Sequence, residues 1–310
     1  MTVGSDAIGM TQASSTAPVG LVGLGNIGSA MLARLTASGP VVGYDVDPVR
    51  REMALQTGAI LADSVAEVAS RCGVVILSLP RPDISQCIVE EISRLPRAYE
   101  QLVIETSTIT AEQANKMHQI ASASGLGYVD AAILSGVGEV ADGSSCFLVG
   151  GSEPDVIKAL PILHRICARY LLLGGPGSGM AAKVINNAVA HAVMVVLAEA
   201  AALGRASGIS LDQLCALLSQ TDAGLKRPLS ARLAGRYRDG KFDGGMPTEV
   251  ARKDSALALD MARSSGVPLF AIQAADVVYE IAVASGLSRK DYAAIVTLWD
   301  TWRQGPRQPV

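Results

Sequence analysis

The sequence has few charged and few aromatic residues for its length of 310. Only 18% of residues are charged and 4% are aromatic, whereas 49% are hydrophobic, so we predict a large core built from Ala, Val, Leu and Ile. The formal net charge is −3 and no block of like charges occurs. Such a balance disfavours nucleic acid or a membrane surface as a partner.

Cysteine and histidine are also scarce. The five cysteines form no C-x-x-C pair and the three histidines lie far apart. We therefore expect reduced thiols, a cytoplasmic protein and no metal site. Residues 1–17 lack a basic segment followed by an apolar one, which predicts a flexible tail rather than a secretory signal. The apolar run 188–203 is shorter than a membrane span and contains His191 and Glu199, which predicts a buried helix of a soluble protein.

Short β-rich runs alternate with helical patterns in the first half of the chain. The predicted strands are 19–23, 41–44, 74–79, 102–105, 127–130, 145–150 and 170–173. They are apolar throughout, which is typical of strands buried on both faces of a mostly parallel sheet. We predict a doubly wound α/β domain of Rossmann type over residues 18–176.

The strand signal stops after Gly179, and the rest of the chain reads as helices. The predicted helices are 180–206, 211–220, 248–264, 268–284 and 289–302, with glycines 208, 266 and 286 at helix ends. Capping-box pairs are found at Thr110–Gln113, Ser152–Asp155, Ser210–Gln213 and Ser288–Asp291. We predict an all-helical substrate and oligomerisation domain over 177–310, joined to the first domain by a long helix. The more polar stretch 225–245 is less regular.

A glycine-rich loop follows the first predicted strand. Gly23, Gly25 and Gly28 fit G-x-G-x-x-G, in which they allow a tight turn, the approach of a pyrophosphate and close helix packing. Asn26 and Ile27 complete the loop at a helix start whose free N–H groups favour phosphate. The alternative is a structural βα turn without a ligand.

Asp45 ends the second predicted strand, 22 residues after Gly23. An acidic residue there holds ribose hydroxyls and disfavours a 2′-phosphate, which favours NAD over NADP. Arg50 and Arg51 follow and either weaken that preference or cover a solvated helix start.

Two further strand ends carry candidate cofactor contacts. The segment VVILSLP ends in Leu79 and Pro80, and VIETST ends in Ser107 and Thr108. Ligands of open α/β sheets bind at such carboxyl ends. For Thr108 the alternative is local capping of the next helix.

Lys183, Asn187 and His191 recur every four residues and so share one stripe of an otherwise apolar helix. The stripe indicates either a solvent-filled cleft beside the helix, or a lysine whose ammonium reaches solvent next to an asparagine amide that is hydrogen-bonded in the core. For His191 we favour a core or interface role. The glycines before Lys183 suggest room for a substrate beside the helix start.

The sequence as a whole resembles the β-hydroxyacid dehydrogenase family. The segments that carry the resemblance, in family order and spacing over about residues 18 to 302, are GLGNIG, VIETSTIT, YVDAAILSGVGEVADGSSCFLVGG, GPGSGMAAKVINN and TEVARKDSALALDMA. The resemblance implies Lys183 as the catalytic general acid and base, Asn187 as a substrate partner, Lys253 at the nicotinamide end of the cofactor, and Thr108 as the family threonine. It also implies a homodimer or homotetramer.

One loop departs from the family pattern. The family usually has Asp-Ala-Pro-Val-Ser-Gly-Gly, whereas this chain has DAAILSG, with Leu134 at the expected serine and Ser135 at a glycine. Ser135 and the backbone of Gly136 remain the predicted contacts with the far end of the substrate. Alternatively, the substrate has an apolar group there.

The resemblance thus implies an NAD(P)-dependent oxidoreductase that acts on a small 3-hydroxy acid, similar to 3-hydroxyisobutyrate, or on its semialdehyde. Two other interpretations stay open. Imine reductases share this architecture but usually have Asp or Tyr at the position of Lys183. A non-catalytic NAD-binding module is the third.

Overall fold

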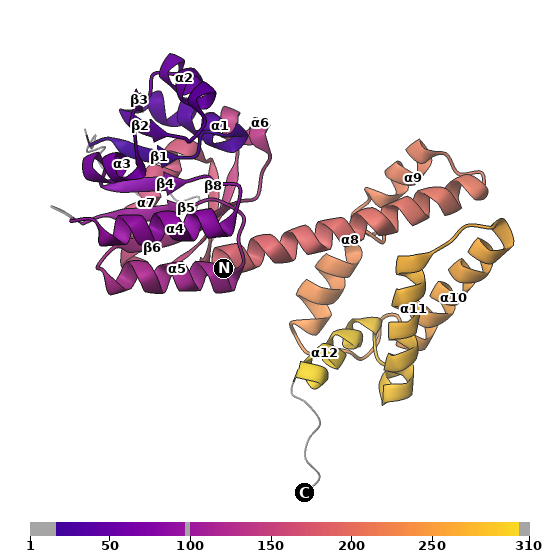
Figure 1. The fold of residues 1–310 in the computed structure, drawn as a ribbon. Helices are drawn as coiled ribbons and strands as arrows, with labels where there is room; N and C mark the ends of the chain where they lie inside the picture. Colours follow the sequence, from indigo (N-terminus) through magenta and orange to yellow (C-terminus); the bar gives the residue numbers. More distant parts are fainter. Residues whose placement is uncertain (1–16, 97–99, 304–310) are drawn as a thin grey trace, which may run out of the picture. The chain divides into compact units, whose positions relative to one another are not determined.

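The computed structural model describes residues 17–96 and 100–303, drawn as a ribbon in Figure 1. The chain forms two compact units, Met1–Ala188 and Val189–Val310. The division falls inside one helix, α8 (Ser178–Ala206). The predicted tail lies almost wholly outside the described residues, and the predicted boundary at 176/177 stays a prediction.

The first unit is built on an eight-stranded sheet in the order β3-β2-β1-β4-β5-β6-β7-β8. The strands are β1 (Val19–Val22), β2 (Val41–Tyr44), β3 (Ile60–Leu61), β4 (Val74–Leu77), β5 (Leu102–Glu105), β6 (Gly127–Ile133), β7 (Cys146–Gly151) and β8 (Arg169–Gly174). All neighbours are parallel except β6 and β7. This confirms the predicted mostly parallel sheet. Sequence patterning missed β3 because two residues show no periodicity.

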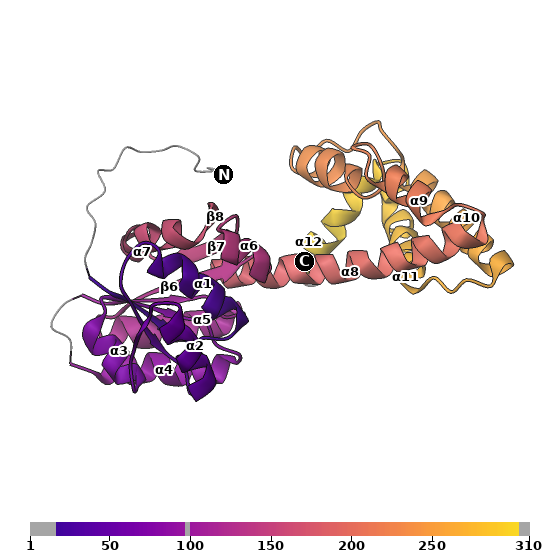
Figure 2. The same ribbon diagram turned by 90° about the horizontal axis from the view of Figure 1, so that it is seen from above.

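Helices cover both faces of the sheet, as Figure 2 shows. The helices are α1 (Asn26–Thr36), α2 (Pro48–Gln56), α3 (Val65–Arg71), α4 (Pro82–Arg94), α5 (Ala111–Ala123), α6 (Val137–Asp142) and α7 (Glu153–Ile166). Side chains of α1, α6 and α7 enter one core cluster, and those of α3, α4 and α5 enter the other. The strands are apolar because each face packs against such a layer.

The order in which the chain adds strands reverses between β1 and β4. β1 pairs with β2 on one side and with β4 on the other. Chain crossovers therefore diverge from this point and leave a crevice outside the carboxyl ends of β1 and β4. The glycine-rich loop and the segment after β4 both begin there.

The second unit contains helices and a small core. Its elements after α8 are α9 (Leu211–Leu218), η1 (Pro228–Tyr237), α10 (Thr248–Ser265), α11 (Phe270–Ala282), η2 (Val283–Leu287), η3 (Tyr292–Ile295) and α12 (Val296–Arg303). Leu203, Ala262 and Leu269 form its buried cluster. Glu199 of α8 accepts the N–H groups of Phe270, Ala271 and Ile272 at 2.6, 2.8 and 3.1 Å. This carboxylate therefore caps α11, whose N-cap Leu269 has no side-chain acceptor.

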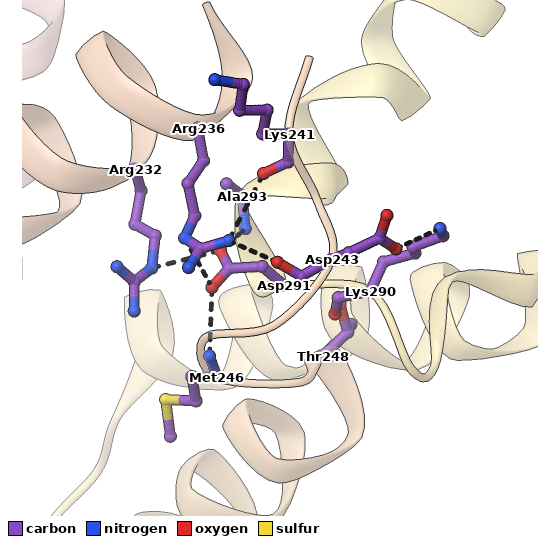
Figure 3. Close-up of polar contacts among 9 residues, drawn as sticks. All are labelled: Arg232, Arg236, Lys241, Asp243, Met246, Thr248, Lys290, Asp291 and Ala293. Atoms are coloured by element: carbon purple, nitrogen blue, oxygen red, sulfur yellow. Dashed lines mark hydrogen bonds and ion pairs between the residues drawn. The ribbon is translucent and has the colours of Figure 1, made fainter. Parts of the chain in front are cut away.

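One predicted helix start is wrong. Ser288 does not cap a helix with Asp291, because its hydroxyl contacts the Glu249 carboxylate. The chain here is held instead against residues 246–248, where Thr248 N–H donates to the Lys290 carbonyl at 2.8 Å. Asp291 itself accepts the N–H of Ala293 at 3.0 Å and begins the short 3₁₀ helix η3 (Figure 3).

The sequence predicts a buried helix, but within the single chain α8 leaves several apolar side chains exposed. Ile185, Val189 and Met194 are 64%, 58% and 62% exposed. The core of the second unit takes up only the end of the helix, at Leu203. By length and composition alone, α8 and the segment Phe270–Leu287 are apolar enough to cross a membrane.

Candidate active site

The glycine-rich loop is shaped by three glycines with different tasks. Gly23 has φ +93°, and a Cβ there would lie 2.2 Å from the Ser78 carbonyl oxygen. A Cβ on Gly28 would lie 2.0 Å from the Gly23 carbonyl oxygen. A Cβ on Gly25 would meet only the Arg50 guanidinium, at 3.5 Å. Gly23 and Gly28 thus close the turn, whereas Gly25 leaves open space over the backbone.

Asp45 lies behind the loop and fixes its position. One carboxylate oxygen accepts the Leu24 N–H at 2.7 Å, and the other accepts the Asp47 N–H at 2.9 Å. The Arg50 guanidinium lies 3.6 Å away. Each carboxylate oxygen can accept a second hydrogen bond. The carboxylate therefore orders the loop and keeps acceptor capacity for ribose hydroxyls.

The ends of β4 and β5 are tied together by side chains. The Leu79 N–H donates to the Ser107 hydroxyl at 2.8 Å, and the Ser107 N–H donates to the Glu105 carboxylate at 2.8 Å. Glu105 is fully buried, and burial raises its pKa to about 7, against the opposing effect of the Ser107 hydrogen bonds. The buried Glu105 side chain thus supports the Ser107 segment, which lines the cavity.

These segments enclose one cavity of about 470 Å³ in the first unit. The predicted site residues that line it are Gly25, Asn26, Ile27, Leu79, Pro80, Thr108, Ser135 and Lys183. Arg50, Ser78, Thr106, Ser107 and Ile133 complete the lining. Thr108 does not cap the next helix, because Thr110 does so. Sequence analysis missed Thr106 and Ile133, because neither belongs to a motif; the only available indication was that they lie near the ends of strands.

Asp130 of β6 fixes the start of α8. Its carboxylate accepts the Gly177 N–H at 2.7 Å and the Met180 N–H at 2.9 Å. A Cβ on Gly179 would lie 2.4 Å from the Leu148 carbonyl oxygen. This glycine therefore makes room for the sheet, and the expectation that the glycines before Lys183 make room for a substrate stays a prediction.

Lys183 stands one turn into α8 and lines the cavity. Partial burial lowers the pKa of Lys183, because desolvation disfavours the ammonium. No ion pair or hydrogen bond holds its amine within the described residues. A lysine with this environment can exchange a proton with a bound molecule.

The departing loop presents a different surface from the family pattern. Leu134 packs against the core, whereas Ile133 and Ser135 line the cavity. The Ser135 hydroxyl accepts the Cys146 N–H at 3.0 Å and keeps its own proton to donate. The Gly136 N–H donates to the exposed Glu139 carboxylate at 3.1 Å.

Besides Gly23, Gly28 and Asp45, which form or hold the loop, three predicted contacts do not line the cavity. Asn187 is half-buried one turn beyond Lys183 and does not line the cavity; its side-chain oxygen lies 3.5 Å from the Asn186 amide nitrogen. Gly136 lies beside the cavity wall. Lys253 belongs to the second unit, where it is 66% exposed and pairs with Asp254 at 3.3 Å.

The crevice fits a dinucleotide. The N-cap of α1, Gly25, provides no side-chain acceptor, so the first N–H groups of the helix stay available for an anion. Open space above Gly25 gives a pyrophosphate access to them. Asp45 stands where ribose hydroxyls are held in this type of fold.

Two family models match consecutive parts of the chain. Residues 18–175 match the NAD binding domain of 6-phosphogluconate dehydrogenase. Residues 177–299 match the NAD-binding model of NADP-dependent 3-hydroxyisobutyrate dehydrogenase.

Individual relatives agree with these models. Mitochondrial 3-hydroxyisobutyrate dehydrogenase of Rattus norvegicus is 29% identical over 91% of this chain and 87% of its own. The 2-(hydroxymethyl)glutarate dehydrogenase of Eubacterium barkeri is 27% identical over 91% and 94%. Among solved structures, 3-hydroxyisobutyrate dehydrogenase of Mycobacterium tuberculosis has a TM-score of 0.65 and 26% identity over 92% and 99%. An imine reductase of Myxococcus stipitatus has a TM-score of 0.82 and 19% identity over 91% and 98%, and shows the fold alone.

A dinucleotide crevice at the sheet reversal, a cavity lysine and matches along both halves of the chain thus agree: the protein belongs to the β-hydroxyacid dehydrogenase family and is an NAD(P)-dependent oxidoreductase that acts on CH–OH groups.

Proposed function

We propose that this protein transfers hydride between a nicotinamide cofactor and a small 3-hydroxy acid, similar to 3-hydroxyisobutyrate, or its semialdehyde. The observation that supports this most is the position of Lys183 in the same cavity as Gly25, Leu79 and Thr108. A proton-transfer group and a dinucleotide cradle therefore share one space. The nicotinamide, when bound, donates or accepts the hydride.

The chain's own residues handle one proton and hold the reactants. In oxidation the neutral Lys183 amine removes the hydroxyl proton of the substrate, and in reduction its ammonium donates a proton to the carbonyl oxygen. Desolvation supports this role, because it moves the lysine pKa towards the working pH. Gly25, Asn26 and Ile27 hold the pyrophosphate.

The far end of the substrate is assigned to Ser135 and Gly136. The Ser135 hydroxyl has a proton to donate to a carboxylate, whereas the Gly136 N–H must first be released by Glu139. Replacement of Glu139 by alanine removes a competing carboxylate. If Gly136 binds the acid, E139A raises kcat/KM for 3-hydroxyisobutyrate and leaves kcat/KM for its methyl ester unchanged. An equal change in kcat/KM for the acid and its methyl ester would show that the Gly136 N–H does not bind the substrate carboxylate.

Two family assignments extend this site. Asn187 is assigned to the substrate oxygen and Lys253 to the nicotinamide end of the cofactor. Lys253→Met should raise KM for NAD with little change in the Tm, since the residue is exposed. An unchanged KM for NAD would show that Lys253 does not contact the cofactor.

The experiment that tests the whole proposal is a panel of short 3-hydroxy acids with NAD and NADP, with wild type beside Lys183→Met. We expect turnover by wild type and a loss of at least ~100-fold in kcat for the variant, with NAD affinity nearly unchanged. A variant that keeps more than about a tenth of wild-type kcat would exclude the assigned role.

Imine reduction is the second candidate. The specific observation that favours it is apolar Ile133 in the cavity lining, while the nearby Gly136 N–H already donates to Glu139; such a site suits an uncharged substrate. A cyclic imine with NADPH, assayed beside the hydroxy acid, distinguishes the two reactions. NAD binding without turnover of either compound would instead indicate a non-catalytic module.

A second copy of the chain is proposed to cover exposed apolar residues of α8. Ile185, Val189 and Met194 would then be buried in a homodimer or homotetramer, as the family resemblance implies. We place this assembly in the cytoplasm, in line with the scattered free cysteines. Mass measurement in solution by light scattering tests it: a monomer over all concentrations would contradict the proposal.

A further inference from the structure

The second unit contains an unbalanced group of buried charges. Asp291 is fully buried and receives two guanidinium groups, from Arg232 at 3.2 Å and from Arg236 at 3.4 Å (Figure 3). Two arginines and one aspartate leave one positive charge without a partner. Burial of an unpaired charge is costly, which makes an additional anion favourable here.

Asp291 has no capacity left to balance that charge. One carboxylate oxygen also accepts the Ala293 N–H at 3.0 Å, and the other accepts the Met246 N–H at 3.0 Å. Arg236 is engaged on its far side as well, since its terminal nitrogen donates to the Asp243 carbonyl at 2.9 Å. Arg232 is the more deeply buried of the two arginines, with 11% of its side chain exposed against 28% for Arg236, so water compensates its charge least.

Arg232 offers a free edge. Only 9% of the residue is exposed, and its guanidinium carbon lies 4.8 Å from the Tyr292 ring centroid. This stacking fixes the plane of the group. In Figure 3 its two terminal nitrogens point away from Asp291, and within the described residues they have no hydrogen-bond partner.

Arg232 lines two cavities that share three residues. The first, of about 490 Å³, is lined by Arg227, Arg232, Gly245, Met246, Pro247, Val250 and Tyr292. The second, of about 770 Å³, shares Arg232, Met246 and Tyr292 and has a mostly apolar wall, with Leu225, Leu229 and Leu233 among its residues. Its one carboxylate, Asp254, already pairs with Lys253.

We propose that Arg232 is the anchor of a second binding site, which holds a small monocarboxylate with an apolar body. The terminal nitrogens of Arg232 match a carboxylate in a two-bond arrangement. One surplus buried charge matches a monoanion rather than a dianionic phosphate. The apolar body packs along Leu229 and Leu233 in the second cavity, and exposed Arg227 lines the first. Binding at this site requires no turnover at Lys183.

Direct binding tests the site without turnover. Acetate, butyrate and hexanoate are titrated into the full chain by calorimetry, with hexanamide as the uncharged match of hexanoate. We expect affinity to rise with chain length by up to about fourfold per methylene, and hexanamide to bind at least about tenfold more weakly than hexanoate. Inorganic phosphate should bind more weakly than butyrate.

Matched variants locate the binding. Arg232→Met should weaken hexanoate about tenfold or more, whereas Arg238→Met should not, because Arg238 is 71% exposed and pairs with Asp239. If R232M fails to fold by circular dichroism, R232K replaces it with the same expected direction, since lysine keeps the charge but loses the two-nitrogen edge. Lys183→Met should bind hexanoate like wild type.

Four results would overturn the proposal. They are no saturable hexanoate binding, equal binding by R232M, equal binding of hexanamide, and loss of binding in K183M alone. Tighter binding of phosphate would overturn the ligand class. A change of oligomeric state in R232M without a change in hexanoate binding would assign the cavity to a second copy of the chain.

Discussion

The carboxylate of Asp130 accepts the N–H of Met180 at 2.9 Å and so links strand β6 to the first turn of α8. A second bond, from Gly177 at 2.7 Å, completes the link. Lys183 follows one turn later and lines the cavity. The position of the proposed proton-transfer group is thus set by a buried side chain 53 residues earlier in the chain (183 − 130).

Asp130→Asn should loosen this link, because an amide replaces one acceptor oxygen by a donor. We expect a loss of about 1–3 kcal/mol in the free energy of unfolding and a lower kcat with little change in KM for NAD. Denaturant unfolding and steady-state kinetics measure the two effects. The matched control is Asp142→Asn, on an exposed surface of the same unit. Loss of stability with unchanged kcat would show that the link does not position Lys183.

The pH dependence should report the protonation of Lys183. Desolvation places its pKa below the ordinary value of 10.5. Since oxidation requires the neutral amine, kcat/KM for oxidation should rise with pH up to that lowered pKa and then level off. Reduction requires the ammonium, so its kcat/KM should fall over the same interval. Profiles that move in the same direction for both reactions would contradict the assignment.

Glu105→Gln should stabilise the protein at neutral and alkaline pH. The folded-state pKa of Glu105 is raised from 4.5 to about 7, so the folded state keeps a proton that the unfolded state releases. The unfolding free energy of wild type should therefore decrease from pH 4.5 to about 7, by at most about 3 kcal/mol.

Glutamine avoids this loss and still accepts the Ser107 N–H. Thermal unfolding from pH 4 to 8 should show a flatter Tm profile for E105Q. Asp130, whose pKa burial also raises, contributes in the same direction and remains in both proteins. Parallel Tm profiles for the variant and wild type would show that Glu105 titrates normally.

Cofactor preference should depend on Asp45. Its buried carboxylate stands beside the loop and repels a 2′-phosphate, so we expect kcat/KM to be higher with NAD than with NADP. Asp45→Asn keeps an acceptor for Leu24 N–H and removes the charge. We expect the NAD to NADP ratio to fall by roughly tenfold, as one lost charge contact suggests. An unchanged ratio would exclude Asp45 as the determinant.

Much of the cofactor half could be predicted from the sequence, because its signals are local. The apolar runs mark β1, β4 and β5 to within about two residues. The G-x-G-x-x-G spacing encodes a turn that needs glycine at fixed positions, and Gly23 adopts the expected positive φ. The capping boxes at Thr110 and Ser210 are also local, and both are formed.

Contacts between distant segments could not be predicted in this way. Ser107 meets Leu79, and Asp291 meets Arg232, only once the chain has folded. Periodicity predicts which face of an element is apolar. It cannot predict a contact between residues that lie 28 or 59 positions apart in the chain (107 − 79; 291 − 232). For the same reason the sequence misplaced the cap at Ser288.

The sequence by itself determined the family, the strand and helix pattern, and the lysine available for proton transfer. Tertiary structure decided which of these residues share a cavity, that Glu139 engages the Gly136 N–H, and that Gly179 makes room for the sheet. The physical reason is that residue type and spacing fix local conformation, whereas burial and charge compensation depend on everything packed around a group.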